Sequence, residues 1–289
     1  MSPDTDAAPV PLERAELVEI AGPDALTFAH AQFASDVRAL ESSSWQWSAW
    51  LTAQGRVQTV FALFRIEPDR LSMWLPLGAA AAVRDALARF VFRAKVSLTV
   101  RDGWTLCRLG DHPATSATPA RRFDAHLGGI AFAQPGTTPR RAWLGPAPSA
   151  SMDVAALDAW RRQDIAAGLP WISAATRDEF VPQALDLERL DAIRYDKGCY
   201  PGQEIAARLH FRGGNKRRLR RLLVSGDAAP QSGLAIERAD GTVGTVLYSA
   251  RSSAGLHDAL AVLIDDVSDA TLTSAAGHSI EVIDDVFHE

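Results

Sequence analysis

Cysteine is scarce in this chain. Only two cysteines, Cys107 and Cys199, occur among its 289 residues, which is too few for a disulfide framework or for a metal cluster held by protein thiolates alone. Long apolar runs are also lacking. The longest one, residues 73–83, contains Pro76 and Gly78 and falls short of the roughly 20 residues that span a bilayer. The sequence therefore predicts no membrane-spanning helix, and we expect Cys199 to act as a thiol.

A large excess of charge of one sign is missing as well. The formal net charge is −5, which argues against nucleic-acid binding by the whole surface. The first 16 residues hold four carboxylates and no apolar segment, unlike a secretory signal or an Arg-rich transit peptide, so we expect the protein in the cytoplasm. Its seven histidines show no zinc-type spacing, and we expect no stable metal site.

Apolar periodicity predicts a series of helices and strands followed by a small β-barrel. Residues 45–66 predict a hairpin that turns at Gln54-Gly55, and residues 111–150 are expected to form loops around one strand at 129–133. At Gly213-Gly214 the sequence changes from mixed helix and strand patterns to short β-rich runs, which divides the chain into predicted domains 1–212 and 213–289. Helices are expected over residues 24–40, 79–92, 154–167 and 186–195, and strands over 17–20, 71–77, 96–100, 104–109, 219–225, 242–248, 259–264 and 280–287.

The candidate reactive residues lie mainly in one segment, Lys197-Gly198-Cys199-Tyr200-Pro201-Gly202-Gln203-Glu204. Two glycines and a proline within eight residues prevent a helix through it, so we expect a tight loop that displays Cys199. Lys197 and the start of a short helix near Gly202 would both stabilise a thiolate, whereas Glu204 would oppose it if it pointed at the sulfur. A buried structural cysteine in a tight turn is the alternative that spacing alone leaves open.

Seven segments, spread over nearly the whole chain except residues 111–150, carry a family resemblance. They are Gly22-Pro23-Asp24 with Phe28, Gln32 and Asp36-Val37; Gln54-Gly55-Arg56-Val57; Arg93-Ala94-Lys95-Val96; residues 167–172; Phe180-Val181-Pro182-Gln183; residues 197–208; and residues 211–217. Together they resemble the YgfZ folate-binding proteins. That family is related to a mitochondrial iron–sulfur assembly factor and, more distantly, to the glycine-cleavage T-protein, an aminomethyltransferase.

The resemblance implies a T-protein-like fold, in which two interleaved α+β parts enclose a folate cavity and a β-barrel follows. It also implies tetrahydrofolate or a derivative as cofactor, with Trp160 against the pterin, although a plain core position for Trp160 is the alternative from periodicity. Cys199 is then the functional thiol and at most a transient metal ligand, and Lys197 and Glu204 are the other two catalytic candidates. The remaining signature residues would shape its loop: Gly198, Tyr200, Gly202 and Gln203.

Family members support assembly or repair of iron–sulfur enzymes, including those that thiolate tRNA. The resemblance therefore implies an accessory protein whose partners are iron–sulfur client enzymes or assembly factors, with an indirect link to tRNA and none to membranes.

Two departures from the T-protein argue against a transferase. No carboxylate follows the hairpin glycine, where the chain reads Val57-Gln58-Thr59, and Ala166 stands where the T-protein has a glutamate that anchors the pterin. Folate would then be held through other groups, such as Asp164, or more weakly. We lean towards a protein without enzymatic activity, because loss of a general acid or base typically costs about 10²- to 10⁴-fold in rate. A tetrahydrofolate-dependent one-carbon transferase or demethylase remains the alternative.

A strip of seven cations without a carboxylate occupies residues 208–221. It could contact tRNA phosphates, a folate polyglutamate tail or an acidic protein, or it could be a solvated strand face paired with the acidic residues 265–289. A non-catalytic protein or RNA interaction module is thus a third hypothesis, although Phe211 alone offers little for base stacking. A Cys199–His210 nucleophile and base pair is also conceivable. The cations are Arg208, Arg212, Lys216, Arg217, Arg218, Arg220 and Arg221.

Overall fold

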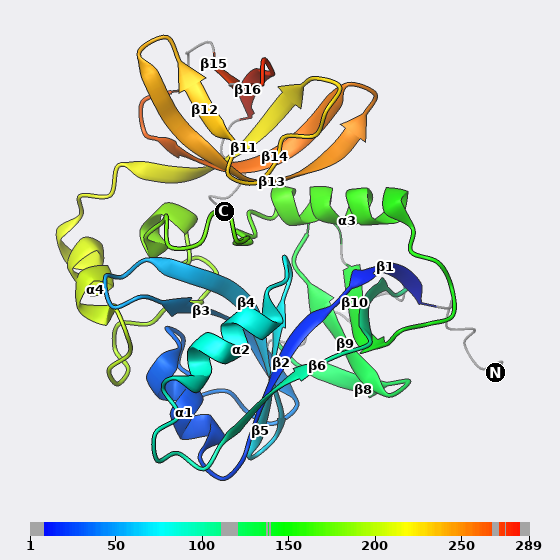
Figure 1. The fold of residues 1–289 in the computed structure, drawn as a ribbon, viewed down its shortest axis with the longest axis vertical. Helices are drawn as coiled ribbons and strands as arrows, with labels where there is room; N and C mark the ends of the chain where they lie inside the picture. Colours follow the sequence, from blue (N-terminus) through cyan, green and yellow to red (C-terminus); the bar gives the residue numbers. More distant parts are fainter. Residues whose placement is uncertain are drawn as a thin grey trace.

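Two five-stranded antiparallel sheets form the body of the protein in this computed structural model (Figure 1). The structure describes residues 9–110, 121–136, 138, 140–267, 272–274 and 276–283. One sheet has the order β3 (Ser44–Leu51), β4 (Val57–Glu67), β5 (Arg70–Leu75), β2 (Glu16–Ala21) and β6 (Ser97–Arg101). The other has the order β1 (Val10–Arg14), β7 (Trp104–Arg108), β10 (Arg140–Pro146), β9 (Gly129–Gln134) and β8 (Phe123–His126).

Some predictions fall partly outside the described residues. These are the acidic leader at 1–8, the loop at 111–120, the end of the predicted strand at 284–287, and the acidic residues Asp269, Asp284, Asp285 and Glu289.

Strand β4 explains how the first sheet separates two apolar cores. Successive side chains of a strand point to opposite faces, and Phe61 and Leu63 join the core beneath the short helices α1 (Ala25–Gln32) and α2 (Ala80–Ala88). Ala62 and Phe64 point the other way, into a second core shared with the other sheet. That second core is rich in indole rings, including Trp45, Trp47, Trp74 and Trp171.

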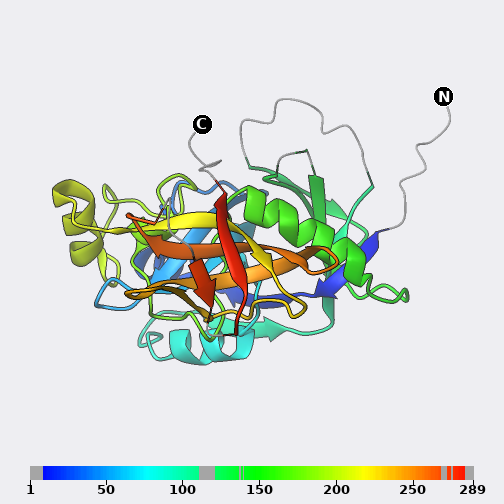
Figure 2. The ribbon, with the colours of Figure 1, turned by 90° about the horizontal axis from the view of Figure 1, so that it is seen from above.

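The C-terminal part is a closed six-stranded barrel, as the sequence predicts. Helix α3 (Val154–Ala166) lies alongside it, between the barrel and the sheets (Figures 1 and 2). The buried Tyr248 hydroxyl of the barrel donates a 2.8 Å hydrogen bond to the Leu169 carbonyl just after α3. The predicted boundary at Gly213-Gly214 stays a prediction. In spatial order the barrel strands are β11 (Arg217–Ser225), β14 (Leu256–Ile264), β13 (Gly241–Ser253), β12 (Ala235–Arg238), β15 (Leu272–Ser274) and β16 (Ser279–Ile283).

The predicted helix over residues 24–40 is wrong beyond Gln32. Phe33 is extended, with φ −98° and ψ 152°, and it forms an isolated β-bridge with Trp50. Phe33 and Val37, which prolong the helical pattern in the sequence, are buried from this non-helical segment instead. Helix α2 likewise ends at Ala88 rather than at residue 92, because Phe90 and Val91 turn back to the carbonyls of residues 87 and 88.

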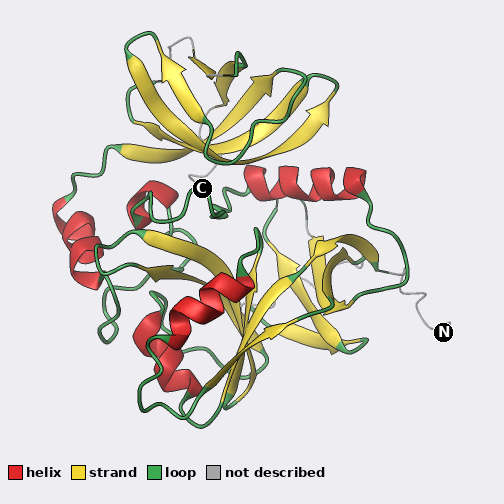
Figure 3. Ribbon diagram, in the orientation of Figure 1, coloured by secondary structure: helices red, strands yellow, loops and turns green. Residues whose placement is uncertain are grey.

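Two further predictions are wrong. Residues 186–195 form turns after a short 3₁₀ helix (Pro182–Leu185), because Asp186 and Asp191 both have φ +53°, a left-handed conformation that ends a right-handed helix. Residues 121–150 hold three strands, β8, β9 and β10, instead of one. Strand β1 was not predicted either. Helices α1 and α2 cover the outer side of the first sheet (Figure 3).

Candidate functional site

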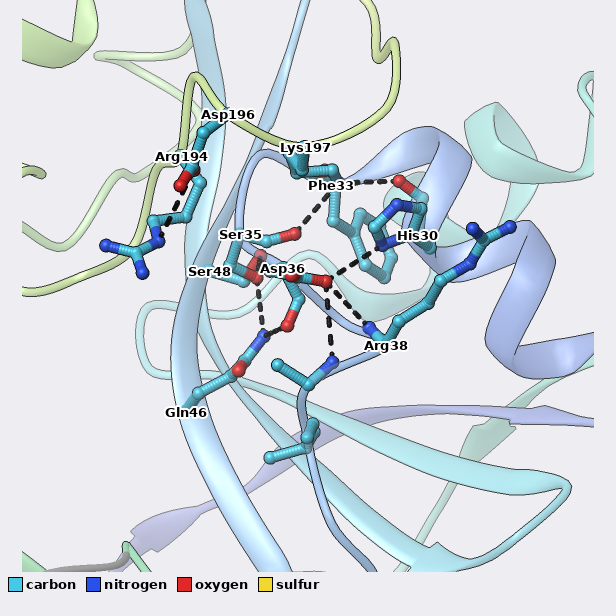
Figure 4. Close-up of polar contacts among 12 residues, drawn as sticks. His30, Phe33, Ser35, Asp36, Arg38, Gln46, Ser48, Arg194, Asp196 and Lys197 are labelled. Atoms are coloured by element: carbon cyan, nitrogen blue, oxygen red, sulfur yellow. Dashed lines mark hydrogen bonds and ion pairs between the residues drawn. The ribbon is translucent and has the colours of Figure 1, made fainter.

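Lys197 attaches the cysteine-bearing loop to the end of α1 (Figure 4). Its ammonium donates hydrogen bonds to the carbonyl oxygens of His30 and Phe33, both at 2.6 Å, and of Ser35 at 2.8 Å. The carbonyls at a helix C-terminus lack intrahelical donors and carry partial negative charge, so they suit an ammonium. Burial lowers the pKa of Lys197 to about 8, while nearby Asp36 favours the charged form. All three ammonium hydrogens are therefore taken by backbone.

Tyr200 and Gln203 fix the other side of the loop. The buried Tyr200 hydroxyl donates to the Arg194 carbonyl at 2.9 Å, and burial raises the pKa of this phenol. The Gln203 amide donates to the Lys197 carbonyl at 3.2 Å. Cys199 lies between these anchors and is exposed, so the alternative of a buried structural cysteine is wrong.

Gly202 brings the signature loop against the β3–β4 turn. Its φ is +78°, and an added Cβ would lie 2.7 Å from Gly55 Cα and would clash with the Thr52 carbonyl oxygen. Only glycine combines this backbone conformation with so close a contact. Helix α4 (Gln203–Arg212) starts directly after it, close to the predicted position. Two motifs separated by almost 150 residues in the sequence thus form one packed unit.

Glu204 and Cys107 lie in contrasting surroundings. Glu204 is exposed in the first turn of α4, and its effect on Cys199, like that of the helix N-terminus, stays a prediction. Cys107 is fully buried in β7, and burial raises its pKa to about 11. This burial fits a structural residue.

His30 is a site residue that the sequence analysis missed. It belongs to the last turn of α1 and is only 7% exposed. Its Nδ1 lies 3.3 Å from Asp36 Oδ1, and its Nε2 lies 3.6 Å from where a Cβ of Gly198 would be. Because 168 residues separate His30 from Gly198, no local spacing could have indicated this pair.

Asp164 belongs to a buried polar network. Its carboxylate accepts hydrogen bonds from Gln134 Nε2 at 2.8 Å, from Trp171 Nε1 at 3.0 Å and from the Arg140 guanidinium. The Arg140 guanidinium in turn covers the Trp160 ring, 4.3 Å from its centroid, and donates to the Trp160 carbonyl at 2.9 Å. Both oxygens of Asp164 are engaged with protein groups, and its contact with folate stays a prediction.

A cavity of about 260 Å³ lies beside Trp160. Trp160 is 3% exposed, yet its indole Nε1 has no hydrogen-bond partner among the described residues, and neither has Gln134 Oε1 nearby. Buried polar atoms usually find partners, so these atoms leave capacity for a bound polar group. The cavity is lined by Arg108, Leu109, Thr138, Arg140, Ala156, Ala159, Trp160 and Gln163.

The basic strip is partly neutralised. Arg218 pairs with Asp265 at 2.7 Å, as the alternative of a strand face paired with residues 265–289 predicts. Arg221 pairs with Asp258 at 2.8 Å, which lies outside that acidic segment. Four other cations of the strip are exposed and form no ion pair within the described part of the chain: Arg208, Arg212, Lys216 and Arg217.

An aromatic cluster adjoins these cations. Phe211 is 75% exposed, and its ring centroid lies 4.7 Å from that of His210, which stacks on Tyr195 at 4.4 Å. His210 Nδ1 lies 2.9 Å from a Glu188 carboxylate oxygen. The sequence analysis missed this cluster because Tyr195 is distant in the sequence. Since His210 is bound to Glu188, the conceivable Cys199–His210 pair gains no support from the geometry.

Other expectations concern acids, metals and membranes. Gln58, at the position where the T-protein has an acid, donates to the Leu51 carbonyl at 3.2 Å. Among the described residues, no group of three or more His, Cys, Asp or Glu side chains is arranged to hold a metal ion. None of the described helices has the length and apolarity needed to cross a membrane.

Comparisons with known proteins agree with this architecture. No family model matches the chain. It is 31% identical over 287 residues to the tRNA-modifying protein YgfZ of Vibrio vulnificus (strain CMCP6), covering 93% of this chain and 87% of that protein. A YgfZ protein of Edwardsiella ictaluri (strain 93-146) is 29% identical over 274 residues, covering 86% and 82%.

The fold is similar to that of the glycine cleavage system aminomethyltransferase T from Bartonella henselae. The TM-score is 0.72 at 14% sequence identity, covering 97% of this chain and 86% of that one. This similarity confirms the predicted T-protein-like fold. With the sequence matches to YgfZ proteins, it confirms the resemblance drawn from the signature, and the chain belongs to the YgfZ family.

Proposed function

We propose that this protein is a folate-binding accessory protein that supports assembly or repair of iron–sulfur enzymes, including tRNA-modifying ones, through the thiol of Cys199. One observation carries the proposal: Cys199 is exposed on a loop that is held in place by hydrogen bonds of Lys197 and Tyr200 to backbone carbonyls. The curated relatives, named tRNA-modifying proteins, support the link to tRNA.

An exposed thiol on a fixed loop suits exchange with a partner protein. Its thiolate form is the nucleophile, and it can carry a persulfide sulfur or a one-carbon adduct between partners. Cys107 has neither the exposure nor the pKa for this, because burial raises its pKa to about 11. Cys199 is thus the thiol through which partner chemistry would proceed.

The cavity beside Trp160 fits part of a folate. A flat heteroaromatic ring gains apolar burial and offset stacking from an indole, and the free Trp160 Nε1 can donate to one of its acceptors. The volume of about 260 Å³ lies just below the range of about 300–1,000 Å³ typical of sites for drug-sized ligands, which suits the pterin end. Trp160, Gln163, Arg108 and Arg140 would hold the ring, with Asp164 fixing Arg140; bound tetrahydrofolate would supply a carrier for one-carbon units.

Titration of reduced folates, followed by tryptophan fluorescence, tests the cofactor. We expect saturable quenching in the wild type that is lost in Trp160→Phe. Trp104→Phe is the matched control, because Trp104 also lies under an arginine, Arg101, with 5.6 Å from guanidinium carbon to ring centroid. Undiminished quenching in Trp160→Phe, or no binding at millimolar folate, would contradict this assignment.

Complementation tests the thiol. In cells that lack the protein, we expect Cys199→Ala to leave the fold and folate binding intact but to abolish support of iron–sulfur enzymes that thiolate tRNA. The measurement is the thiolated fraction of cellular tRNA, with Cys107→Ala as the matched cysteine control. Full thiolation with Cys199→Ala would remove the central claim.

A second candidate, a non-catalytic protein or RNA interaction module, is favoured by one observation. Phe211 is 75% exposed beside unpaired cations of α4, a combination that suits a phosphate backbone with an unstacked base. Direct binding of tRNA that weakens with salt, is lost in Phe211→Ala and is indifferent to Cys199→Ala would favour this candidate.

A further inference from the structure

The loop that connects α2 to β6 carries two exposed aromatic side chains (Figure 1). Phe92 is 86% exposed, and Phe90 is 41% exposed. Phenylalanine is usually buried, because a ring in water forgoes the free energy of burial. A single exposed ring is ordinary, but two rings on one short loop mark a surface that contacts something outside the chain.

Contacts at both ends hold this loop in place. Phe90 packs edge-on against the buried Trp50, with 6.1 Å between ring centroids and 87° between ring planes. At the other end, the Lys95 backbone N–H donates to the Asp24 carboxylate at 2.7 Å, and a Cβ on Gly22 would clash with the Lys95 carbonyl oxygen. Because the loop is already fixed, binding requires little further loss of conformational freedom.

The backbone N–H groups at the tip of the loop already have partners. Those of Phe90, Val91 and Phe92 donate to the carbonyl oxygens of residues 87, 88 and 90 at 2.9, 3.1 and 3.2 Å. An N–H group that enters an apolar phase without a partner costs free energy. These three N–H groups can therefore leave water without that cost.

The rings are flanked by positive charge. No carboxylate occurs over residues 86–95, and the preceding Asp85 pairs with Arg84 at 2.6 Å. The loop is thus an apolar tip with a positive rim, and the surface that complements it is negatively charged. Three cations of the loop are exposed and form no ion pair within the described part of the chain: Arg89, Arg93 and Lys95.

The size of this surface distinguishes among anionic partners. Three cations are few for a nucleic acid, since interfaces with about 6–10 phosphate contacts are common. At roughly 200 Å² for a whole aromatic side chain, the two rings expose roughly 250 Å², whereas a stable protein interface buries about 800 Å² on each partner. A lipid bilayer needs neither a row of phosphate contacts nor a large complementary area, because apolar tips enter between headgroups and cations contact anionic headgroups.

We propose that this loop binds the surface of an anionic lipid bilayer. Phe92 and Phe90 enter between the headgroups, and the three cations contact negatively charged ones. Binding is reversible, because a short apolar tip and a few charges give only modest affinity. The family resemblance implies no link to membranes, so this surface goes beyond that expectation. It depends on neither Cys199 nor folate.

Flotation of the full chain with vesicles tests the proposal. We expect the wild type to bind vesicles of phosphatidylcholine that contain about 40% phosphatidylglycerol, and not vesicles of phosphatidylcholine alone. Phe92→Ala should lower the partition coefficient about tenfold, because it loses the burial of the ring. Arg93→Gln should lower it about fivefold through the loss of one cation. Added salt should weaken binding of the wild type by screening the charges.

Matched variants show whether the effect belongs to this loop. Phe211→Ala removes another exposed ring that lies beside cations, and Lys216→Gln removes another exposed cation. Both should leave vesicle binding unchanged. All four substituted side chains are exposed, so the variants should fold, which their melting temperatures check.

Absence of wild-type binding to the anionic vesicles would overturn the proposal. Equal partition coefficients for the wild type, Phe92→Ala and Arg93→Gln would overturn it as well. Binding of tRNA, without vesicle binding, that both loop variants weaken would instead assign the loop to a nucleic acid. None of these results bears on the proposed function, which complementation with Cys199→Ala tests separately.

Discussion

The contact between Gly202 and the β3–β4 turn predicts a specific loss of stability in Gly202→Ala. The variant would hold an alanine at φ +78° and would place its Cβ 2.7 Å from Gly55 Cα, against backbone that has no flexible end to move aside. Gly103 supplies a matched control. Its φ is +73°, and nothing lies within 4 Å of the Cβ that an alanine would add. The two variants share the conformational strain and differ in the clash.

The magnitude follows from these two contributions. Holding an L-residue in the left-handed region costs roughly 1–2 kcal/mol, which is all that Gly103→Ala should lose. Overpacking adds about 1–3 kcal/mol in Gly202→Ala, so we expect the two variants to differ by about 2 kcal/mol. At about 2–3 °C per kcal/mol for a chain near this size, the melting temperature of Gly202→Ala should lie about 5 °C below that of Gly103→Ala.

Differential scanning calorimetry of the wild type and both variants, at one pH and protein concentration, measures this difference. Equal melting temperatures for Gly202→Ala and Gly103→Ala would refute the reasoning. They would mean that the signature loop can move away from the β3–β4 turn without any loss of stability. The site would then not depend on the contact between Gly202 and Gly55.

Two further variants test buried polar groups, each measured by urea unfolding. Lys197→Met removes the donor of three carbonyl oxygens and should lower the free energy of unfolding by about 2–4 kcal/mol. The control Lys216→Met, at an exposed position, should change it by less than about 0.5 kcal/mol. Equal effects of the two variants would argue against Lys197 as the loop anchor. Arg140→Met leaves the Asp164 carboxylate buried beside Gln134 and Trp171 without its cation and should lose about 3–5 kcal/mol. The control Arg14→Met, which breaks the exposed pair with Asp102, should lower the free energy of unfolding by at most about 1 kcal/mol. Comparable losses of stability in Arg140→Met and Arg14→Met would contradict the importance assigned to Arg140.

Local signals account for the features that the sequence alone determined. The hairpin over residues 45–66, helix α3 and most barrel strands follow from periodicity and from glycine turns. The exposed cysteine loop follows from two glycines and a proline around Cys199, since these residues restrict the backbone wherever they occur. The signature also identified the family, because its residues occupy fixed positions along one short segment.

Tertiary packing decided the rest. Phe33 and Val37 continue a helical pattern, yet burial against the sheet gains more than another helical turn would, so α1 ends at Gln32. Asp186 adopts a left-handed conformation that composition does not reveal.

The surroundings of Cys199 depend on the fold in the same way. Adjacency in sequence suggested that Lys197 acts on the thiol, whereas its ammonium binds carbonyls more than 160 residues away. His30 reaches Gly198 across a similar separation. Sequence spacing constrains only neighbours along the chain, and these contacts exist because the sheets and the signature loop bring distant backbone together.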